Sequence, residues 1–585
     1  MIEEPTAAQV IARVLKGEGV EHIFGVGGGS IFPFMLACSQ EGIRLVHFRH
    51  EQGAAFAADA YARAGRRAGV VFLFAGPGYT NASNGIAQAY HAHSPVVVVV
   101  GQHSTLADHR GASAPSYAAE ALRTITKAQY RMVDERLAAY FTKKALAEAL
   151  AYPPGPVVLE VPENLQVRRR PAREQRGYLE GFRPPVAEPA TSPAAIAEAL
   201  QLMARAQRPV IVAGEQVYWD GAVEELRQLA EALNIPVITR RLARGAVPEG
   251  HPLAFSSRTR GAILRQADLV FLIGLTLGYL EDFGRWGSQA RFIQLHKTER
   301  EVQPFVPTDL VLLGNAREVL GQMAQAAPKP PPREEWLGLI EGIKRAEAER
   351  LAAEAEAARH HQPLHPAFVA QEIVAALDPS ATVIFDAYTG SAFLTERFKA
   401  SFPGQVLDTG EWITVGHGVG MGIGAQLARP GRPVLVMMGD GGIGIGGFDV
   451  ETAVRCRLPV VYFISNNSSW LSGEVELFIG DQFLLSDGSR GNPFLLTPVH
   501  YDQVFEALGC FVQRVEEPRQ LRPALEKALS SGRTAVIDAV VDRKVYHPML
   551  LRGGPGHRWI GAEKMPEPGR RIAFPELYEK RPVKG

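Results

Sequence analysis

The segment from residue 438 to residue 467, MGDGGIGIGGFDVETAVRCRLPVVYFISNN, decides the fold prediction for this chain. The apolar run VLVMM at 434–438 is typical of a buried strand, and FDVETAVRCR at 448–457 has helical spacing. Leu458-Pro459 ends that helix, and the following PVVYFIS is a second apolar strand. The segment therefore predicts a strand–helix–strand unit of a parallel α/β sheet.

Two oxygen-bearing side chains follow the two strands of this unit. A right-handed crossover makes the strands parallel, so Asp440 and Asn467 at their carboxyl ends are expected to lie side by side. Mg²⁺ binds about six oxygen ligands and takes some of them from phosphate and water. The backbone amides of the glycine-rich stretch 441–447 allow a phosphate group to approach closely. The unit therefore predicts a site for a divalent cation that holds a diphosphate.

The same glycines allow two other interpretations. Gly442, Gly444 and Gly447 form a GxGxxG pattern after a strand, which on its own is a weak indication of a dinucleotide site. A nicotinamide dinucleotide would require an acidic residue at the end of the next strand, where this sequence has Asn466 and Asn467. In the other interpretation the glycines form only a tight turn. The asparagines favour the diphosphate hypothesis over the nicotinamide one.

Length and composition limit the class of protein. A chain of 585 residues is expected to form about three domains. Lys plus Arg and Asp plus Glu both number 62, so no global charge favours nucleic acid or an anionic membrane. The three cysteines, Cys38, Cys456 and Cys510, form no CxxC pair, which fits a reducing cytoplasm rather than a disulfide framework or a zinc site. We expect neither a secretion signal nor a membrane span, because the longest apolar runs have the length of strands.

Short apolar runs alternate with amphipathic helical stretches along the chain, which predicts an α/β protein with three doubly wound parallel-sheet domains. The expected domains cover residues 1–165, 190–326 and 365–545. A polar, proline-containing linker separates the first two, and a proline-rich segment followed by an Ala/Glu/Arg-rich helix precedes the third. Residues 546–585 form a basic, Gly/Pro-rich tail that is a candidate lid.

The pattern Gly-Asp-Gly followed about 26 residues later by Asn-Asn resembles the metal and diphosphate motif of thiamine diphosphate (ThDP) enzymes of the acetolactate synthase, oxalyl-CoA decarboxylase, 2-hydroxyacyl-CoA lyase and benzaldehyde lyase group. The resemblance implies that the side chains of Asp440 and Asn467 and the backbone carbonyl of Ser469 bind Mg²⁺. It implies pyrimidine-binding, central and diphosphate-binding domains in that order. It also implies diphosphate contacts at Ala387, Tyr388, Thr389, Gly390, Gly439, Asp440, Gly441, Gly442 and Asn467.

The first block contains a candidate for the catalytic carboxylate of such an enzyme. The stretch RHEQGAAFAADAYARAG around Glu51 resembles the family's segment around the glutamate that binds N1′ of the aminopyrimidine ring and promotes catalysis. Two other interpretations of Glu51 are open: a ribose-binding acid about 26 residues after Gly25, or an ordinary helix-start glutamate. The order of a glutamate block and a later GDG…NN block favours the ThDP site. The family places its cofactor between subunits, so a homodimer or homotetramer is expected.

Further cofactor contacts follow from the resemblance. The turn GPGYTN, from Gly76 to Asn81, matches the family's turn beside the pyrimidine ring. Ile413 and Val415 fall in the segment that props ThDP into its bent conformation. Valine is smaller than the usual apolar residue, so Met421 is a candidate to supplement it.

Four residues are candidate substrate contacts. Ser30 occupies a position where some relatives have histidine, and His91 precedes Ala92, where relatives commonly have aspartate. Lone histidines such as His91 and His93 are more often structural than catalytic. Trp470 and Glu474 follow the predicted metal loop and either reach the substrate cavity or form a solvent-facing lid.

Basic residues in two regions are candidate nucleotide contacts. Arg258, Arg260 and Arg265 would contact an ADP or FAD in the central domain, although relatives include both nucleotide binders and empty domains. The tail would meet CoA phosphates, or remain solvated, through Arg552, His557, Arg558, Lys564, Arg570 and Arg571.

These observations predict a ThDP- and Mg²⁺-dependent C–C lyase or carboligase that acts on a small molecule. GFDVETAVRCRLP and HYDQVFEALG resemble most closely the 2-hydroxyacyl-CoA lyase branch, in which an aldehyde or ketone and formyl-CoA are joined or separated. The alternative is an acetolactate synthase-like enzyme or decarboxylase that acts on 2-oxo acids. A remote alternative is an NAD-linked oxidoreductase.

Overall fold

The computed structural model describes residues 4–114, 116–169, 171, 190–286, 289–386, 388–471 and 483–547. Ala387, Glu474 and the six basic tail residues named above lie outside the described residues. The chain divides into two compact units, which we describe separately. Unit 1 contains residues 1–347, 379–384 and 399–434, and unit 2 contains residues 348–378, 385–398 and 435–585.

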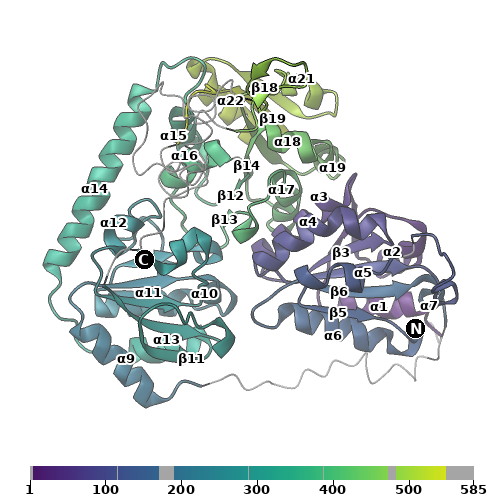
Figure 1. Ribbon diagram of the computed structural model, residues 1–585, viewed down its shortest axis with the longest axis horizontal. Helices are drawn as coiled ribbons and strands as arrows, with labels where there is room; N and C mark the ends of the chain where they lie inside the picture. Colours follow the sequence, from purple (N-terminus) through teal and green to yellow (C-terminus); the bar gives the residue numbers. More distant parts are fainter. Residues whose placement is uncertain are drawn as a thin grey trace. The chain divides into compact units, whose positions relative to one another are not determined.

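Unit 1 begins with a six-stranded parallel sheet in the order β2-β1-β3-β4-β6-β5 (Figure 1). Its strands are β1 (His22–Gly25), β2 (Arg44–His47), β3 (Gly69–Phe74), β4 (Val96–Gln102), β5 (Ala128–Arg131) and β6 (Val157–Pro162). Its helices are α1 (Ala7–Gly17), α2 (Phe32–Gln40), α3 (Glu51–Gly65), α4 (Pro77–His91), α5 (Ala118–Ala121), α6 (Ala138–Leu150) and α7 (Glu163–Gln166). Apolar residues of α1, α2 and α6 form a buried core with the sheet.

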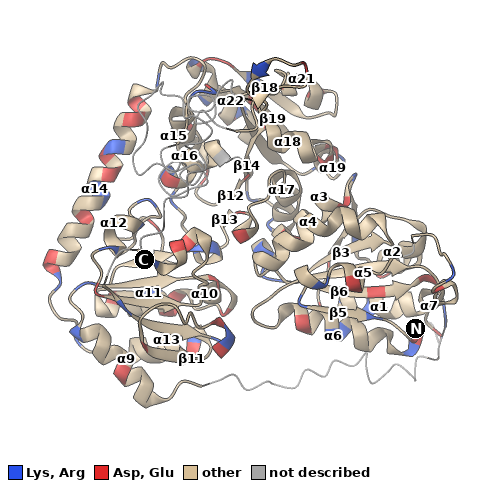
Figure 2. Cartoon of the chain, in the orientation of Figure 1, with Lys and Arg blue, Asp and Glu red and all other residues tan. Residues whose placement is uncertain are grey.

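The central sheet of unit 1 has five parallel strands in the order β11-β10-β9-β7-β8. Its strands are β7 (Pro209–Ala213), β8 (Val237–Thr239), β9 (Leu269–Ile273), β10 (Arg291–His296) and β11 (Thr308–Leu313). Its helices are α9 (Pro193–Arg205), α10 (Glu215–Trp219), α11 (Val223–Leu233), α12 (Arg260–Leu264) and α13 (Ala316–Gln325). Helix α14 (Glu334–Ala357) follows, and acidic and basic side chains are interspersed along it (Figure 2).

The third sheet has the strand order β13-β12-β14-β15-β19-β18. Its strands are β12 (Thr382–Phe385), β13 (Val406–Leu407), β14 (Val434–Gly439), β15 (Val460–Asn466), β18 (Phe511–Val515) and β19 (Ala535–Val540). The helices of this region are α15 (Pro366–Ala376), α16 (Tyr388–Arg397), α17 (Gly418–Ala428), α18 (Asp440–Gly446), α19 (Val450–Arg455), α21 (Tyr501–Glu506) and α22 (Pro518–Ser530). A small antiparallel pair, β16 (Phe483–Leu484) and β17 (Arg490–Gly491), lies outside this sheet.

These sheets confirm the predicted fold class of three parallel-sheet α/β domains. The exact boundaries of the three domains stay a prediction. Two local features differ from the sequence expectation. The half-exposed edge strand β5 has no clear apolar run, and the glycine-rich stretch after β14 forms the short helix α18 rather than only a tight turn. No helix among the described residues is long and apolar enough to cross a membrane.

Helix α3 is buried along nearly its whole length, and most of its buried residues are alanine or glycine. A Cβ atom on Gly85 of α4 would lie 2.5 Å from Cβ of Ala55, and one on Gly424 of α17 would lie 2.0 Å from the carbonyl oxygen of Ala57. Both distances are shorter than any van der Waals contact, so the neighbouring helices pack against α3 only because glycine has no side chain. This packing fixes the helix that begins with Glu51.

Gly424→Ala is therefore expected to destabilise unit 1. The added methyl group collides with the main chain of α3, and overpacking of this kind costs about 1–3 kcal/mol. Gly338→Ala in α14 is the matched control, because nothing lies within 4 Å of its Cβ position; it should leave stability unchanged or raise it by about 0.5–1 kcal/mol. Thermal denaturation of both variants measures the difference, and equal melting temperatures would contradict the packing argument.

Candidate active site

The predicted metal ligands Asp440 and Asn467 converge in unit 2. Asp440 is the first residue of α18, directly after β14, and Asn467 directly follows β15. The backbone N–H of Ser469 donates to both Oδ2 of Asp440 and Oδ1 of Asn467, each over 3.1 Å. The structure thus confirms that the two side chains lie together, as the strand–helix–strand pattern predicted.

The carboxylate of Asp440 is well suited to a cation. Its residue is only 2% exposed, and burial raises its pKa to about 6 against the opposing effect of nearby backbone N–H groups, including that of Ser469. No group of three or more His, Cys, Asp or Glu side chains within the described ranges could hold a metal ion alone. One carboxylate and one amide oxygen held together fit a hard cation that takes its other ligands from phosphate and water.

The glycines after Asp440 are covered on one side and less crowded on the other. A Cβ atom on Gly441 would lie 2.8 Å from the ring of Trp470, so this ring packs directly over the turn while 46% of the residue stays exposed. A Cβ on Gly442 would meet nothing nearer than the carboxylate of Asp386, at 3.4 Å. Trp470 therefore borders the candidate metal site.

Helix α16 places the second set of predicted diphosphate contacts next to β14. Thr389 and Gly390 lie in its first turn, which begins at Tyr388. A Cβ atom on Gly390 would lie 2.2 Å from Cε of Met437, and the backbone N–H of Asp386 donates to the carbonyl of Met437 over 2.8 Å. The start of α16 is thus held against the strand that leads to Asp440.

Glu51 in unit 1 combines burial with a specific polar partner. It is the first residue of α3 and is 5% exposed. The side-chain amide of Asn81 in α4 donates to Oε2 of Glu51 over 3.0 Å. Gly76, at the start of α4, has φ +65°, and a Cβ there would lie 2.7 Å from Cβ of Ala114. Two residues predicted as cofactor contacts are thus brought together, and burial argues against an ordinary surface glutamate.

The turn from Gly410 to Val415, which we call the cofactor turn, presents apolar side chains to solvent in unit 1. Ile413 is 47% exposed and has φ +52°, a conformation that β-branched residues rarely adopt, and Val415 is 40% exposed. Met421, by contrast, is fully buried against Arg63 and Gln88. The expectation that Met421 supplements Val415 is therefore wrong, because its side chain is fixed between helices.

Contacts that the sequence did not indicate hold the cofactor turn against α4. Nε1 of Trp412 donates to Oδ1 of Asn84 over 2.7 Å, and the Asn84 amide donates to Oγ1 of Thr414 over 2.9 Å. The ring of Trp412 stacks on that of His91 with centroids 5.1 Å apart. No local pattern predicts these pairs, because more than 300 residues separate their members.

The remaining substrate candidates have structural partners. The Ser30 hydroxyl donates to the carbonyl of Gly101 over 2.8 Å and accepts from the N–H of Ala75 over 3.4 Å. Burial lowers the pKa of His91, and burial lowers that of His93 to about 4. Both histidines are therefore neutral at pH 7, and a direct role in substrate binding stays a prediction.

Two of the three candidate nucleotide-binding arginines pair with carboxylates inside the protein. Nε of Arg258 donates to Glu347 over 2.9 Å. Arg260 forms an ion pair with Glu281. Nη1 of Arg265 lies 3.4 Å from the position that a Cβ atom on Gly261 would occupy. Arg258 and Arg260 are thus paired with carboxylates of the protein without a nucleotide.

The predicted cofactor residues form two groups, which we call the half-sites: one around Glu51 and one around Asp440 and Asn467. Comparisons with known proteins agree with this division. Residues 5–122 match the family model described as thiamine pyrophosphate enzyme, N-terminal TPP binding domain. Residues 196–323 match its central domain, and residues 389–539 match its C-terminal TPP binding domain. A probable acetolactate synthase of Mycobacterium bovis is 33% identical over 93% of this chain and 97% of its own length. The chain belongs to the thiamine pyrophosphate enzyme family.

Two other relatives are named for two different activities. A probable acetolactate synthase large subunit of Methanocaldococcus jannaschii is 28% identical over 94% of both chains. The human 2-hydroxyacyl-CoA lyase 1 is 27% identical over 96% of this chain and 98% of its own length. The family assignment confirms the prediction of a ThDP-dependent enzyme. It argues against the alternative of an NAD-linked oxidoreductase.

Proposed function

We propose that this ThDP enzyme is a Mg²⁺-dependent lyase or carboligase that breaks or forms a carbon–carbon bond next to a carbonyl group. The observation that carries the proposal is the convergence of Asp440 and Asn467 on one backbone N–H, in a chain whose family binds a diphosphate cofactor. These two side chains would hold a divalent cation, which would supply positive charge for the diphosphate.

Each type of contact that the family resemblance implies has a candidate in this chain's own residues. Asp440, Asn467 and the carbonyl of Ser469 would hold Mg²⁺, and the first turns of α16 and α18 would bind the diphosphate. Glu51 would hold a proton at N1′ of the aminopyrimidine, with Asn81 fixing the orientation of its carboxylate. The cofactor, when bound, supplies an electron sink for the carbon at which the bond breaks or forms.

For the substrate we propose the 2-hydroxyacyl-CoA lyase class, with 2-oxo acids as a second candidate. The resemblance of 447–459 and 500–509 to the lyase branch supports the first, and the 27% identical human lyase agrees with it. The 33% identity to a probable acetolactate synthase supports the second. The tail that would meet CoA lies outside the described residues.

We further propose a homodimer or homotetramer in a reducing cytoplasm. The exposed apolar residues Trp412, Ile413 and Val415 of unit 1, and Ile445 and Phe448 of unit 2, support subunit contacts beside the half-sites. The three cysteines are free thiols, which supports a reducing compartment.

Calorimetry followed by a product screen tests the proposed function. Titration with ThDP in Mg²⁺ should show saturable binding that is lost when EDTA replaces Mg²⁺. The loaded enzyme is then supplied either with an aldehyde and formyl-CoA or with pyruvate, and the products are identified by mass spectrometry. A 2-hydroxyacyl-CoA supports the first substrate class and acetolactate the second. Absence of Mg²⁺-dependent ThDP binding would refute the proposed function.

A further inference from the structure

The carboxyl edge of the central sheet carries an unusual concentration of buried charge. Strand β7 is followed by Glu215, β8 by Arg240 and Arg241, and β9 by the loop that contains Gly278 and Glu281. The chain runs from β7 to its neighbour β8 and then crosses to β9 on the other side of β7, which places the topological switch point between β7 and β9 at this edge. Open α/β sheets bind their ligands at such points.

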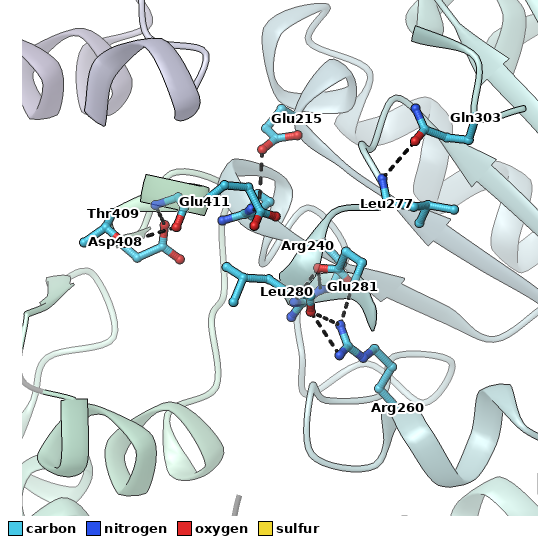
Figure 3. Close-up of polar contacts among 12 residues, drawn as sticks. Glu215, Arg240, Arg260, Leu277, Leu280, Glu281, Gln303, Asp408, Thr409 and Glu411 are labelled. Carbon is cyan, nitrogen blue, oxygen red and sulfur yellow. Dashed lines mark hydrogen bonds and ion pairs between the residues drawn. The ribbon is translucent and has the colours of Figure 1, made fainter. Parts of the chain in front are cut away.

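Glu411 of the cofactor turn reaches into this edge. Nη2 of Arg241 donates to Oε1 of Glu411 over 2.5 Å. A Cβ atom on Gly278 would lie 2.9 Å from the same oxygen and 3.0 Å from Cδ, so the carboxylate would have to shift if residue 278 had a side chain. Figure 3 shows Glu215 and Glu411 turned toward each other, with Asp408 and Thr409 beside them.

The backbone of Arg241 has a conformation that residues with side chains rarely adopt. Its φ of +55° lies in the left-handed region, although it has a side chain. Such conformations persist where the surrounding structure enforces them, and they are frequent at functional sites. Glu215 lies 4.0 Å from Nε of Arg241, and burial raises the pKa of Glu215 to about 7 against the effect of Arg241. Glu411 is therefore the hydrogen-bonded ionic partner of Arg241, and Asp408 adds a further electrostatic attraction.

The neighbouring arginines do not compete for Glu411. Glu281 is fully buried and pairs with both Arg240 and Arg260 (Figure 3). Nη1 of Arg241, in contrast, has no hydrogen-bond partner within the part of the chain that the structure describes. The Arg241–Glu411 hydrogen bond is thus distinct from those of the Arg240–Glu281–Arg260 group, although Arg241 also interacts electrostatically with Glu281.

The other side of the cofactor turn rests on α4. A Cβ atom on Gly410, where φ is +62°, would lie 3.3 Å from Cα of Ala92, and Trp412 stacks on His91. Glu411 lies between these two contacts in the sequence. The turn is therefore held from two directions, by α4 and by the edge of the central sheet.

We propose that Arg241 and Glu411 are positioning residues through which the central domain fixes the cofactor turn. The carboxylate of Glu411 takes the place at the switch point that a bound anion takes in other open α/β sheets, so the ligand of this domain is a part of the chain itself. The consequence for ThDP rests on the proposed function: Ile413 and Val415 reach their cofactor-binding positions only while the pair is formed.

Glu411→Gln in the full-length protein tests this proposal by two readouts. In the ThDP-free protein, amide hydrogen exchange of residues 408–416 should accelerate by at least about tenfold, because the turn loses one of its two supports. ThDP affinity, measured by calorimetry with Mg²⁺, should fall by about 10-fold to 100-fold, as for other residues that orient ligand contacts. The exchange readout does not depend on ThDP, so it stands even if the wild type binds none and the proposed function fails.

Glu249→Gln is the matched control. Glu249 pairs with Arg244 in the same domain, over 2.8 Å and with both side chains below 10% exposure. The Glu249→Gln substitution should lower the melting temperature about as much as Glu411→Gln does. It should leave amide hydrogen exchange at 408–416 and ThDP affinity unchanged. If Glu411→Gln lowers only the melting temperature, the pair is merely structural and the proposal is wrong.

Two further variants keep the result decisive. Arg241→Met combined with Glu411→Gln should weaken ThDP binding no more than the stronger single variant, because both changes remove the same contact; additive losses would contradict a paired role. Gly278→Ala leaves every charge in place but pushes Glu411 away, and it should accelerate exchange at 408–416 to a smaller degree. If Glu411→Gln does not fold, unchanged exchange in Gly278→Ala overturns the proposal.

Discussion

Replacing Glu51 by glutamine is expected to lower turnover by about 100-fold to 10,000-fold, the usual contribution of a positioned acid–base group. Glutamine keeps the size of the side chain and can still accept the hydrogen bond from Asn81. It cannot hold a proton at the pyrimidine nitrogen as a carboxyl group does. Steady-state kinetics with the substrate pair found in the product screen measure the loss, and calorimetry should show ThDP binding within about tenfold of the wild type.

Glu163→Gln is the matched control for this prediction. Glu163 also begins a helix directly after a strand, but it is exposed. If Glu51 acted only through the helix dipole, both substitutions would have the same small effect, at most about 1 kcal/mol on stability. Full turnover in Glu51→Gln would remove the catalytic role and leave a structural glutamate.

The diphosphate half of the site could be predicted from the sequence because its geometry is local. Asp440 and Asn467 belong to one strand–helix–strand unit, and the handedness of the crossover fixes which ends of the strands meet. The shared N–H of Ser469 lies two residues beyond Asn467, within the same loop. Periodicity and chain connectivity were therefore sufficient.

The support of the cofactor turn could not be predicted in this way. Arg241 and Glu411 are 170 positions apart, and Asn84 and Trp412 are 328 apart. Their segments approach because separately encoded parts of unit 1 pack together, and no apolar pattern records which loops then meet. The left-handed conformations of Arg241 and Ile413 give no signal either, since neither residue type favours them.

Replacing Asp440 by asparagine is expected to weaken Mg²⁺-dependent ThDP binding by at least about 100-fold, the upper end of the effect of residues that only orient metal ligands. Asparagine can still accept the N–H of Ser469, so the local fold is retained. What is lost is the charge that balances the cation. Calorimetry at pH 8 with saturating Mg²⁺ measures the change. Asp449→Asn, at another buried aspartate nine positions along, is the control and should bind normally.

The same substitution should stabilise the ThDP-free protein at pH 8. Burial raises the pKa of Asp440 from 3.8 to about 6, so the folded chain holds this proton more tightly than the unfolded chain does. Its contribution to stability is therefore full below pH 4, declines as the pH rises to 6, and is lost above. A shift of this size corresponds to about 3 kcal/mol. Asp440→Asn should thus raise the melting temperature at pH 8 and leave it unchanged at pH 4.

Opposite signs for binding and stability separate a metal ligand from a structural carboxylate. In the wild type, Mg²⁺-dependent ThDP affinity should fall about tenfold per pH unit below pH 6, because the protonated side chain cannot bind the cation. In Asp440→Asn this dependence should disappear. A variant that is both less stable at pH 8 and unchanged in ThDP affinity would show that Asp440 supports the α18 turn. In that case Asp440 would not be a destabilising buried carboxylate that is retained for metal binding.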